Sequence, residues 1–143
     1  MTYLDASALV KLFVPEVESD ALNASLLGAT DIVVSDLAVT ESASALGRRV
    51  REGHLTRRAA RDLHRRIIAF ADRAIGVETV PAVHHEARRL LLASDQPLRT
   101  LDALHLALAL DAQATAIVTY DPCLRDASLT QGLEVHTPTV RAR

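Results

Sequence analysis

Several residue types that mark common kinds of protein are nearly absent from this sequence. Its 143 residues include a single cysteine, Cys123, which excludes an internal disulfide, and no cysteine–histidine set has the spacing of a zinc site. A P-loop and a GxGxxG nucleotide motif are also missing. No apolar run reaches the length of a membrane span. We therefore expect a cytoplasmic protein, without a membrane anchor, that folds as one domain over residues 1–143.

Lysine is almost absent as well, so arginine carries the basic charge. Lys11 is the only lysine among 16 basic residues, and the net charge of −2 does not by itself indicate a nucleic-acid binder. Eight arginines lie in the segment Arg48–Arg66, against only Glu52 and Asp62. Guanidinium groups suit phosphate, but a charged run of this kind is also typical of a solvated helix face. The sequence alone leaves both interpretations of this segment open.

What the sequence does contain is a regular alternation of short β-like runs and longer helical segments. The expected strands are Thr2–Leu4, Asp31–Val34, Val77–Val80, Ala116–Thr119 and Leu133–His136. The expected helices are residues 6–14, 16–27, 36–51, 56–75, 81–94 and 101–113, with N-caps at Ser35 and Thr100, a stop at Gly76, and no regular structure after Pro138. Strands separated by helices indicate an α/β fold in which helices cover both faces of a parallel sheet. Such sheets bind ligands beyond the carboxyl ends of their strands, so residues directly after strands are candidates for chemistry.

Two aspartates follow expected strands. Asp5 comes directly after the first strand, and Asp121 lies two residues after Thr119, where the fourth strand ends. Each has an ordinary structural explanation, because Asp5 can cap a helix that begins at Ala6 and Asp121 precedes a proline in a typical turn pair. Taken one at a time, neither aspartate predicts a functional site.

Two further acids lie on helices with apolar surfaces. Glu41 falls on the stripe that contains Leu37 and Ala45, where an ionised carboxylate is costly unless Arg48 or an arginine of the next helix pairs with it. Asp102 lies in the first turn of its helix, where the helix dipole favours an acid, and its neighbours on that surface are mostly apolar. For each of these acids a structural role and a functional role are both open.

Asp5, Glu41, Asp102 and Asp121 gain a meaning together that none has alone. All four stand near one edge of the expected sheet or on a helix that faces it. Four carboxylates cannot share a pocket fully ionised unless some of them take up protons or a cation sits among them. Carboxylate oxygens suit hard divalent ions, so the sequence predicts a site for Mg²⁺, with Mn²⁺ as a substitute.

At these acids the sequence resembles the PIN-domain family, and in particular the VapC-type toxins. The stretches that carry the resemblance are residues 3–16, 35–41, 101–107 and 117–122. The first and third are the most specific, and the resemblance extends from residue 2 to about residue 136. No acidic position departs from the family pattern, whereas the Arg48–Arg66 segment matches it only in general character.

The resemblance implies a PIN-like three-layer α/β/α fold around a five-stranded parallel sheet in the order 3-2-1-4-5, which places Asp5 and Asp121 side by side where the strand order reverses. It implies a Mg²⁺-dependent endoribonuclease, the toxin of a VapBC-type toxin–antitoxin pair. Asp5, Glu41, Asp102 and Asp121 would be the catalytic and metal-binding residues. RNA as the substrate, a cognate VapB-type antitoxin and a homodimer are implied as well.

The mechanism expected from these residues is hydrolysis of an RNA phosphodiester by water that one or two Mg²⁺ ions activate. Ser7 and Thr119 are candidates to hydrogen-bond those carboxylates or a metal-bound water. The alternatives are a helix-capping hydroxyl for Ser7 and a strand position for Thr119, which its β-branched side chain favours. Phosphoryl transfer through an aspartyl nucleophile is a second class, but Ser7 follows Asp5 where a second aspartate is expected, and no lysine follows the later strands. A domain that only binds a partner is the third.

Overall fold

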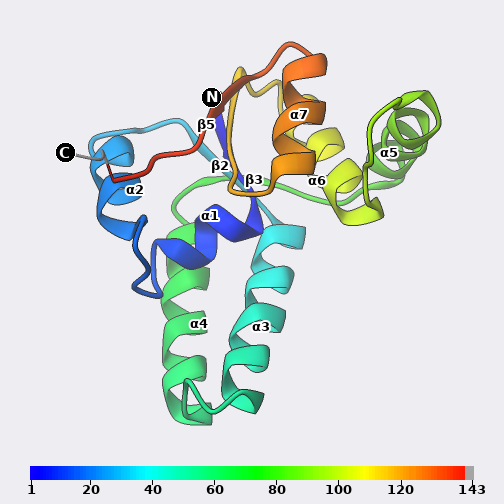
Figure 1. Ribbon diagram of the computed structural model, residues 1–143. Helices are drawn as coiled ribbons and strands as arrows, with labels where there is room; N and C mark the ends of the chain where they lie inside the picture. The colour runs from blue at the N-terminus through cyan, green and yellow to red at the C-terminus, as the bar shows by residue number, and fades with distance from the viewer. Residues whose placement is uncertain (141–143) are drawn as a thin grey trace.

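The structure is a computed structural model that describes residues 1–140, and a parallel sheet of five strands lies at its centre (Figure 1). The strands are β1 (Thr2–Leu4), β2 (Ile32–Ser35), β3 (Ile75–Val77), β4 (Ala116–Val118) and β5 (Glu134–His136). Their order is β3-β2-β1-β4-β5, and every neighbouring pair is parallel. The predicted α/β class and strand order are therefore confirmed.

Seven helices in the described part of the chain surround this sheet. They are α1 (Ala6–Lys11), α2 (Ser19–Leu26), α3 (Asp36–Arg51), α4 (Arg57–Ala71), α5 (Pro81–Ala93), α6 (Thr100–Asp111) and α7 (Pro122–Thr130). In Figure 1, α3 and α4 form a hairpin that projects away from the sheet. Ser35 accepts a hydrogen bond from the backbone N–H of Ala38 and caps α3, as expected.

Two apolar clusters, one on each face of the sheet, form the core. Successive strand residues point to opposite faces, so Tyr3 and Leu4 belong to different clusters. Tyr3 packs with Val33 and Ile117, its register partners, against α5, α6 and α7. Leu4 packs on the other face against α1, α2, α3 and α4. The result is the expected three-layer arrangement, in which the ends of β1 and β4 emerge together.

Two expected boundaries in the middle of the chain are wrong. The helix expected over residues 56–75 ends at Ala71, and β3 replaces the strand expected over residues 77–80. Gly76 was expected to stop the helix, but it lies inside this edge strand, with open space where a Cβ would stand. The strand lies earlier because its backbone pairs with β2, and that pairing outweighs the weak strand preference of glycine.

Helix α7 is absent from the elements expected from the sequence. The Asp121–Pro122 pair starts this helix rather than forming an isolated turn. Asp121 accepts hydrogen bonds from the backbone N–H groups of Cys123 (2.8 Å) and Leu124 (3.0 Å), and Pro122 occupies the first turn. The cap expected at Thr100 is also wrong, because Arg99 is the N-cap residue of α6 and Thr100 is helical.

The remaining differences are at the ends of elements. Helix α1 ends at Lys11, before the expected end at Val14, and α2 begins later than expected, at Ser19. Residues 138–140 form no helix or strand, as expected, and the rest of that expectation, for residues 141–143, lies outside the described residues. Within residues 1–140, no helix is both long enough and apolar enough to cross a membrane.

Candidate active site

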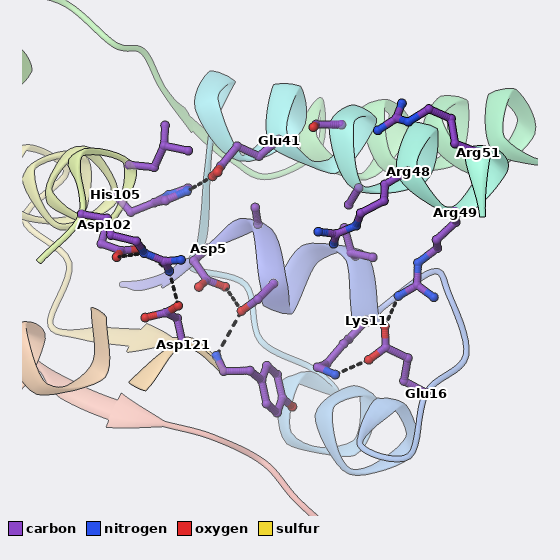
Figure 2. A pocket seen from close by; sticks show the side chains of 18 residues that line it. Asp5, Lys11, Glu16, Glu41, Arg48, Arg49, Arg51, Asp102, His105 and Asp121 are labelled. Atoms are coloured by element: carbon purple, nitrogen blue, oxygen red, sulfur yellow. Dashed lines mark hydrogen bonds and ion pairs between the residues drawn. The ribbon is translucent and has the colours of Figure 1, made fainter. Parts of the chain in front are cut away.

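One pocket of about 810 Å³ lies at the carboxyl edge of the sheet (Figure 2). The four acids predicted from the sequence all line it, although they come from different elements: Asp5 follows β1, Glu41 is on α3, Asp102 is on α6, and Asp121 precedes α7. The strand order reverses between β1 and β4, and parallel sheets bind ligands at such a reversal. The structure thus brings the four candidate residues into one site.

Asp5 is buried and is held on both oxygens. Its Oδ1 accepts hydrogen bonds from the Ser7 hydroxyl (2.7 Å) and the Ala8 N–H (2.8 Å), and its Oδ2 accepts one from the Thr119 hydroxyl (2.5 Å). Thr119 Oγ1 accepts in turn from the backbone N–H of Asp121 (3.0 Å), so one hydroxyl links the two aspartates. Asp5 is also the N-cap of α1, so its structural role and its place in the pocket coexist.

Burial raises the pKa of Asp5, and the hydrogen bonds from Thr119, Ala8 and Ser7 oppose this rise. A folded carboxyl with a raised pKa binds its proton more tightly than the unfolded chain does. Asp5 therefore contributes its full favourable free energy to folding at pH values below the pKa of the carboxyl in the unfolded chain, which is about 3.9. This contribution is lost as the pH rises through the higher pKa that Asp5 has in the folded protein.

We therefore expect Asp5→Asn to gain free energy of unfolding relative to the parent protein as the pH rises from about 4 towards neutrality, because the neutral amide has no buried charge to acquire. Urea denaturation of both proteins in EDTA measures this difference at each pH. Carboxyl groups far from Asp5 titrate alike in the two proteins, so their contributions cancel in the comparison. A difference that stays constant with pH would contradict the raised pKa.

Arg99 joins Asp102 to Asp121 and is a site residue that the sequence interpretation missed. Its Nε donates to Asp102 Oδ2 (2.9 Å), and its Nη2 forms an ion pair with Asp121 Oδ2. Asp102 is buried, whereas 70 % of the Arg99 side chain is exposed. Arg99 precedes Asp102 by three residues, a spacing that lets side chains meet on a helix, and this was the available signal.

Glu41 pairs with His105 of α6, and not with Arg48 or an arginine of the next helix, which were the partners that a purely structural role would have required. Its Oε2 contacts His105 Nε2, and His105 Nδ1 lies 2.7 Å from the hydroxyl of Tyr3. Burial raises the pKa of Tyr3 well above its ordinary value, so this hydroxyl keeps its proton. His105 follows Asp102 by three residues and was missed because a histidine on a mostly apolar helix surface is more often a core residue.

The far end of the pocket is basic (Figure 2). Arg48, Arg49 and Arg51 of α3 line it together with Lys11 of α1. Arg49 and Lys11 both form ion pairs with Glu16, whereas Arg48 and Arg51 form none within residues 1–140. The sequence interpretation placed Arg48 and Arg51 in its basic segment but missed Lys11 and Glu16. The pocket therefore has an acidic end and a basic end, and two of its arginines are available to an anion.

The donor chemistry of the four acids fits a hard divalent cation, because all of them offer carboxylate oxygens. In this structure, however, the chain's own cationic and N–H groups are their partners: Arg99 contacts Asp102 and Asp121, and His105 contacts Glu41. Consistent with this pairing, no three His, Cys, Asp or Glu side chains of the described residues are arranged to hold an ion. A cation that takes Asp102 and Asp121 as ligands would displace Arg99, whose side chain is largely exposed.

Fold and pocket together define an α/β domain whose acidic site lies at the reversal of strand order. Residues 2–128 match the family described as the PIN domain. Ribonuclease VapC46 of Mycobacterium tuberculosis is 39% identical over 142 residues, which cover 96% of this chain and 97% of that relative. The chain therefore belongs to the PIN domain family, in its VapC branch.

Solved structures show the same fold. The crystal structure of VapC20 of Mycobacterium tuberculosis, described as a toxin that cleaves the sarcin–ricin loop, has a TM-score of 0.71 at 16% identity and covers 89% of this chain and 95% of that chain. VapBC2 of Rickettsia felis, solved with a DNA fragment from its promoter, has a TM-score of 0.65 at 14% identity. The match covers 95% of this chain and 98% of that chain. At these identities the likeness concerns the fold alone.

Proposed function

We propose that the protein is a Mg²⁺-dependent endoribonuclease and the toxin of a VapBC-type toxin–antitoxin pair. The observation that carries this proposal is the pocket, which joins four carboxylates at one end to the arginines Arg48 and Arg51 at the other. A site that cleaves a phosphodiester needs both signs of charge locally, because the reacting phosphate is anionic. The ribonuclease name of a 39% identical relative supports RNA as the substrate.

Asp5, Glu41, Asp102 and Asp121 would hold Mg²⁺, for which Mn²⁺ is a substitute. When bound, such an ion lowers the pKa of a coordinated water and neutralises charge on the phosphate. Asp5 is already fixed in place by its three hydrogen bonds, so it does not have to be ordered when a ligand arrives. Asp102 and Asp121 become available once Arg99 leaves them.

Arg99 should compete with the cation. We expect Arg99→Gln to bind Mn²⁺ about twofold to fivefold more tightly in calorimetric titration, the scale of an exposed ion pair. The same variant should melt at a lower temperature in EDTA and regain the difference in saturating Mn²⁺. Arg125→Gln is the matched control, because Arg125 is an exposed arginine that pairs with Asp126. Weaker Mn²⁺ binding by Arg99→Gln would show that Arg99 supports the ion rather than competing with it.

The basic end of the pocket should hold RNA phosphates. Replacing Arg48 and Arg51 together by glutamine should weaken RNA binding and flatten the slope of log affinity against log salt by about 1.4, at about 0.7 for each phosphate contact on a single strand. The control replaces Arg88 and Arg89, which are exposed on α5. An unchanged slope in the Arg48 and Arg51 variant would show that these arginines only solvate the surface of α3.

A VapB-type antitoxin is the proposed partner, supported by membership of the VapC branch and by a structural neighbour solved as a VapBC pair. We expect induced expression of the protein alone to stop bacterial growth, and co-expression with its cognate antitoxin to restore it. The purified protein, for which a homodimer is the proposed state, should cleave RNA in Mg²⁺ but not in excess EDTA. Normal growth without cleavage would contradict the proposal, and cleavage undiminished by EDTA would contradict its metal dependence.

A further inference from the structure

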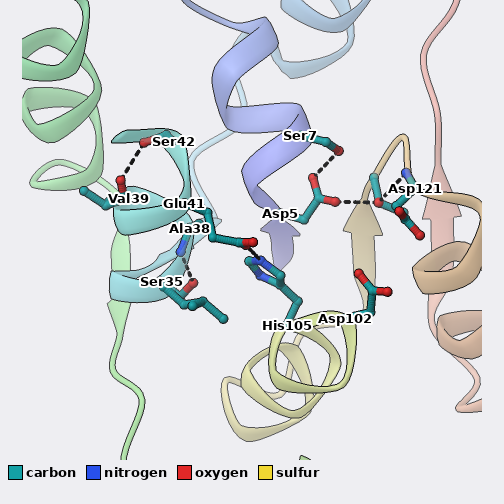
Figure 3. Close-up of polar contacts among 12 residues, drawn as sticks. Asp5, Ser7, Ser35, Ala38, Val39, Glu41, Ser42, Asp102, His105 and Asp121 are labelled. Carbon is teal, nitrogen blue, oxygen red and sulfur yellow. Dashed lines mark hydrogen bonds and ion pairs between the residues drawn. The ribbon is translucent and has the colours of Figure 1, made fainter. Parts of the chain in front are cut away.

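A chain of hydrogen bonds begins and ends on helix α3 and passes through β2, β1 and α6. Figure 3 shows its two ends, the contact of Ser35 with Ala38 and the contact of His105 with Glu41. The backbone N–H of Ala38 donates to Ser35 Oγ (3.0 Å), and Ser35 Oγ lies 2.7 Å from the Tyr3 hydroxyl on β1. The Tyr3 hydroxyl lies 2.7 Å from His105 Nδ1 on α6, and His105 Nε2 contacts Glu41 Oε2. Ser35, Tyr3 and His105 are between 0% and 3% exposed, so water does not replace these contacts.

Only one direction of donation satisfies every group in this chain. If Ser35 donates to Tyr3 and Tyr3 donates to His105 Nδ1, the ring carries its proton on Nε2 and donates to Glu41. If His105 Nδ1 carries a proton instead, Tyr3 must donate to Ser35, and the Ser35 hydroxyl then has no acceptor within the described residues. A buried hydroxyl without an acceptor is costly, so the first direction is favoured.

We propose that His105, oriented through Ser35 and Tyr3 so that its Nε2 faces Glu41, is a positioning residue that holds Glu41 toward the acidic pocket. One oxygen of Glu41 is bound by the ring, and the other has no hydrogen-bond partner among residues 1–140. The ring itself is held by the edge-to-face contact with Tyr3, whose centroid is 5.9 Å away. This inference rests on the proposed function, in which Glu41 is a ligand of the cation.

The physical benefit is that Glu41 is ordered before a ligand binds. A free glutamate side chain occupies many rotamers, and restricting them on binding opposes affinity. The histidine removes that cost in advance, in the way that ligand-supporting residues orient metal ligands in other sites. The same chain ties the start of α3 to β1 and α6, so the backbone that carries Glu41 is fixed together with its side chain.

The first test measures the tautomer of His105 in the metal-free protein. Long-range ¹H–¹⁵N spectra distinguish a protonated ring nitrogen from a bare one, and we expect His105 to show Nε2 protonated and Nδ1 bare at neutral pH. Tyr3→Phe removes only the hydroxyl that donates to Nδ1 and should reduce the population of this form. Ser128→Ala, which removes a buried hydroxyl that has no hydrogen-bond partner within residues 1–140, should leave it unchanged. A protonated Nδ1 in the parent protein would overturn the proposal.

The second test measures whether the position of Glu41 matters for binding. Tyr3→Phe should weaken Mn²⁺ affinity about threefold to tenfold by calorimetric titration, whereas Ser128→Ala should not change it. His105→Gln, which retains an N–H donor for Glu41, should bind more tightly than His105→Asn, whose shorter side chain does not reach. Because a buried histidine can be needed for folding, Tyr3→Phe decides the matter: parental affinity in that variant would overturn the positioning role. A parent that binds no Mn²⁺ contradicts the proposed function instead and leaves the tautomer to decide on His105.

Discussion

Glu41→Gln should abolish RNA cleavage and toxicity together, lowering the cleavage rate by at least about three orders of magnitude, or about 4 kcal/mol. Glutamine keeps the length of the side chain and its carbonyl oxygen still accepts from His105, so only the negative charge is lost. That charge is what a divalent cation needs from this position. The circular dichroism spectrum should therefore match that of the parent while the activity disappears.

Glu86→Gln is the matched control for this variant. Glu86 is a helical glutamate that pairs with one basic side chain, Arg89, on α5 and does not line the pocket. The Glu86→Gln variant should cleave RNA and stop bacterial growth as the parent protein does. If Glu41→Gln remains as toxic as the parent, the assignment of Glu41 to the site is wrong even though the family is right.

Asp102→Asn should weaken Mn²⁺ binding at least about tenfold, or about 1.4 kcal/mol, in calorimetric titration. The carboxylate is buried at the start of α6, so few other groups can take its place as an oxygen ligand with a full charge. Asp5→Asn should have an effect of the same size for the same reason. Both variants should keep the fold. Asparagine retains one oxygen to accept hydrogen bonds, and at position 5 its amide N–H can donate to the Thr119 hydroxyl oxygen in place of the bond that Oδ2 accepts.

Asp111→Asn serves as the control for Asp102→Asn, since Asp111 is an exposed aspartate at the end of the same helix. Its Mn²⁺ affinity should equal that of the parent. Unchanged affinity in both Asp5→Asn and Asp102→Asn would rule out the proposed metal site, whatever the activity of the protein.

The central strands could be predicted because their residues are buried on both faces of the sheet. Ile32, Val33 and Val34 form an unbroken apolar run, and such runs are typical of parallel strands covered by helices. The edge strand β3 was misplaced because Gly76 carries no side chain to signal a strand, and its pairing with β2 is a tertiary contact. Local pattern was sufficient in the middle of the sheet and at its β5 edge, and insufficient at the β3 edge.

The four acids could be predicted because a carboxylate is conspicuous after a strand or on an apolar helix face. Apart from Arg99 and Asp102, which are three residues apart, their partners could not, because those contacts join residues far apart in the sequence: Arg99 and Asp121 are 22 residues apart, and His105 and Glu41 are 64 apart. The sequence shows where charge is costly, whereas the fold decides which group relieves it. That the chain's own Arg99 lies between Asp102 and Asp121 follows only from the structure.

The surroundings of Asp5 argue against the second enzyme class, phosphoryl transfer through an aspartyl nucleophile. Both oxygens of Asp5 accept hydrogen bonds and the side chain is buried, so it cannot turn to attack a substrate, while Oδ2, which accepts only one hydrogen bond, keeps a lone pair for a cation. Lys11, the only lysine, pairs with Glu16. These contacts favour a fixed ligand over a nucleophile. Loss of cleavage with retained antitoxin binding in Glu41→Gln separates the nuclease from a domain that only binds a partner.

The chemistry of the RNA ends tests the central claim, metal-dependent hydrolysis at the acidic pocket, most directly. Attack by water at phosphorus needs no ribose 2′-hydroxyl, so RNA cut by the purified protein in Mg²⁺ should carry 5′-phosphate and 3′-hydroxyl ends. The end groups of the products can be identified by mass spectrometry and by their sensitivity to a 5′-phosphate-dependent exonuclease. The Glu41→Gln variant serves as the negative control. Fragments that end in 2′,3′-cyclic phosphate, or that form equally well in excess EDTA, would contradict the account.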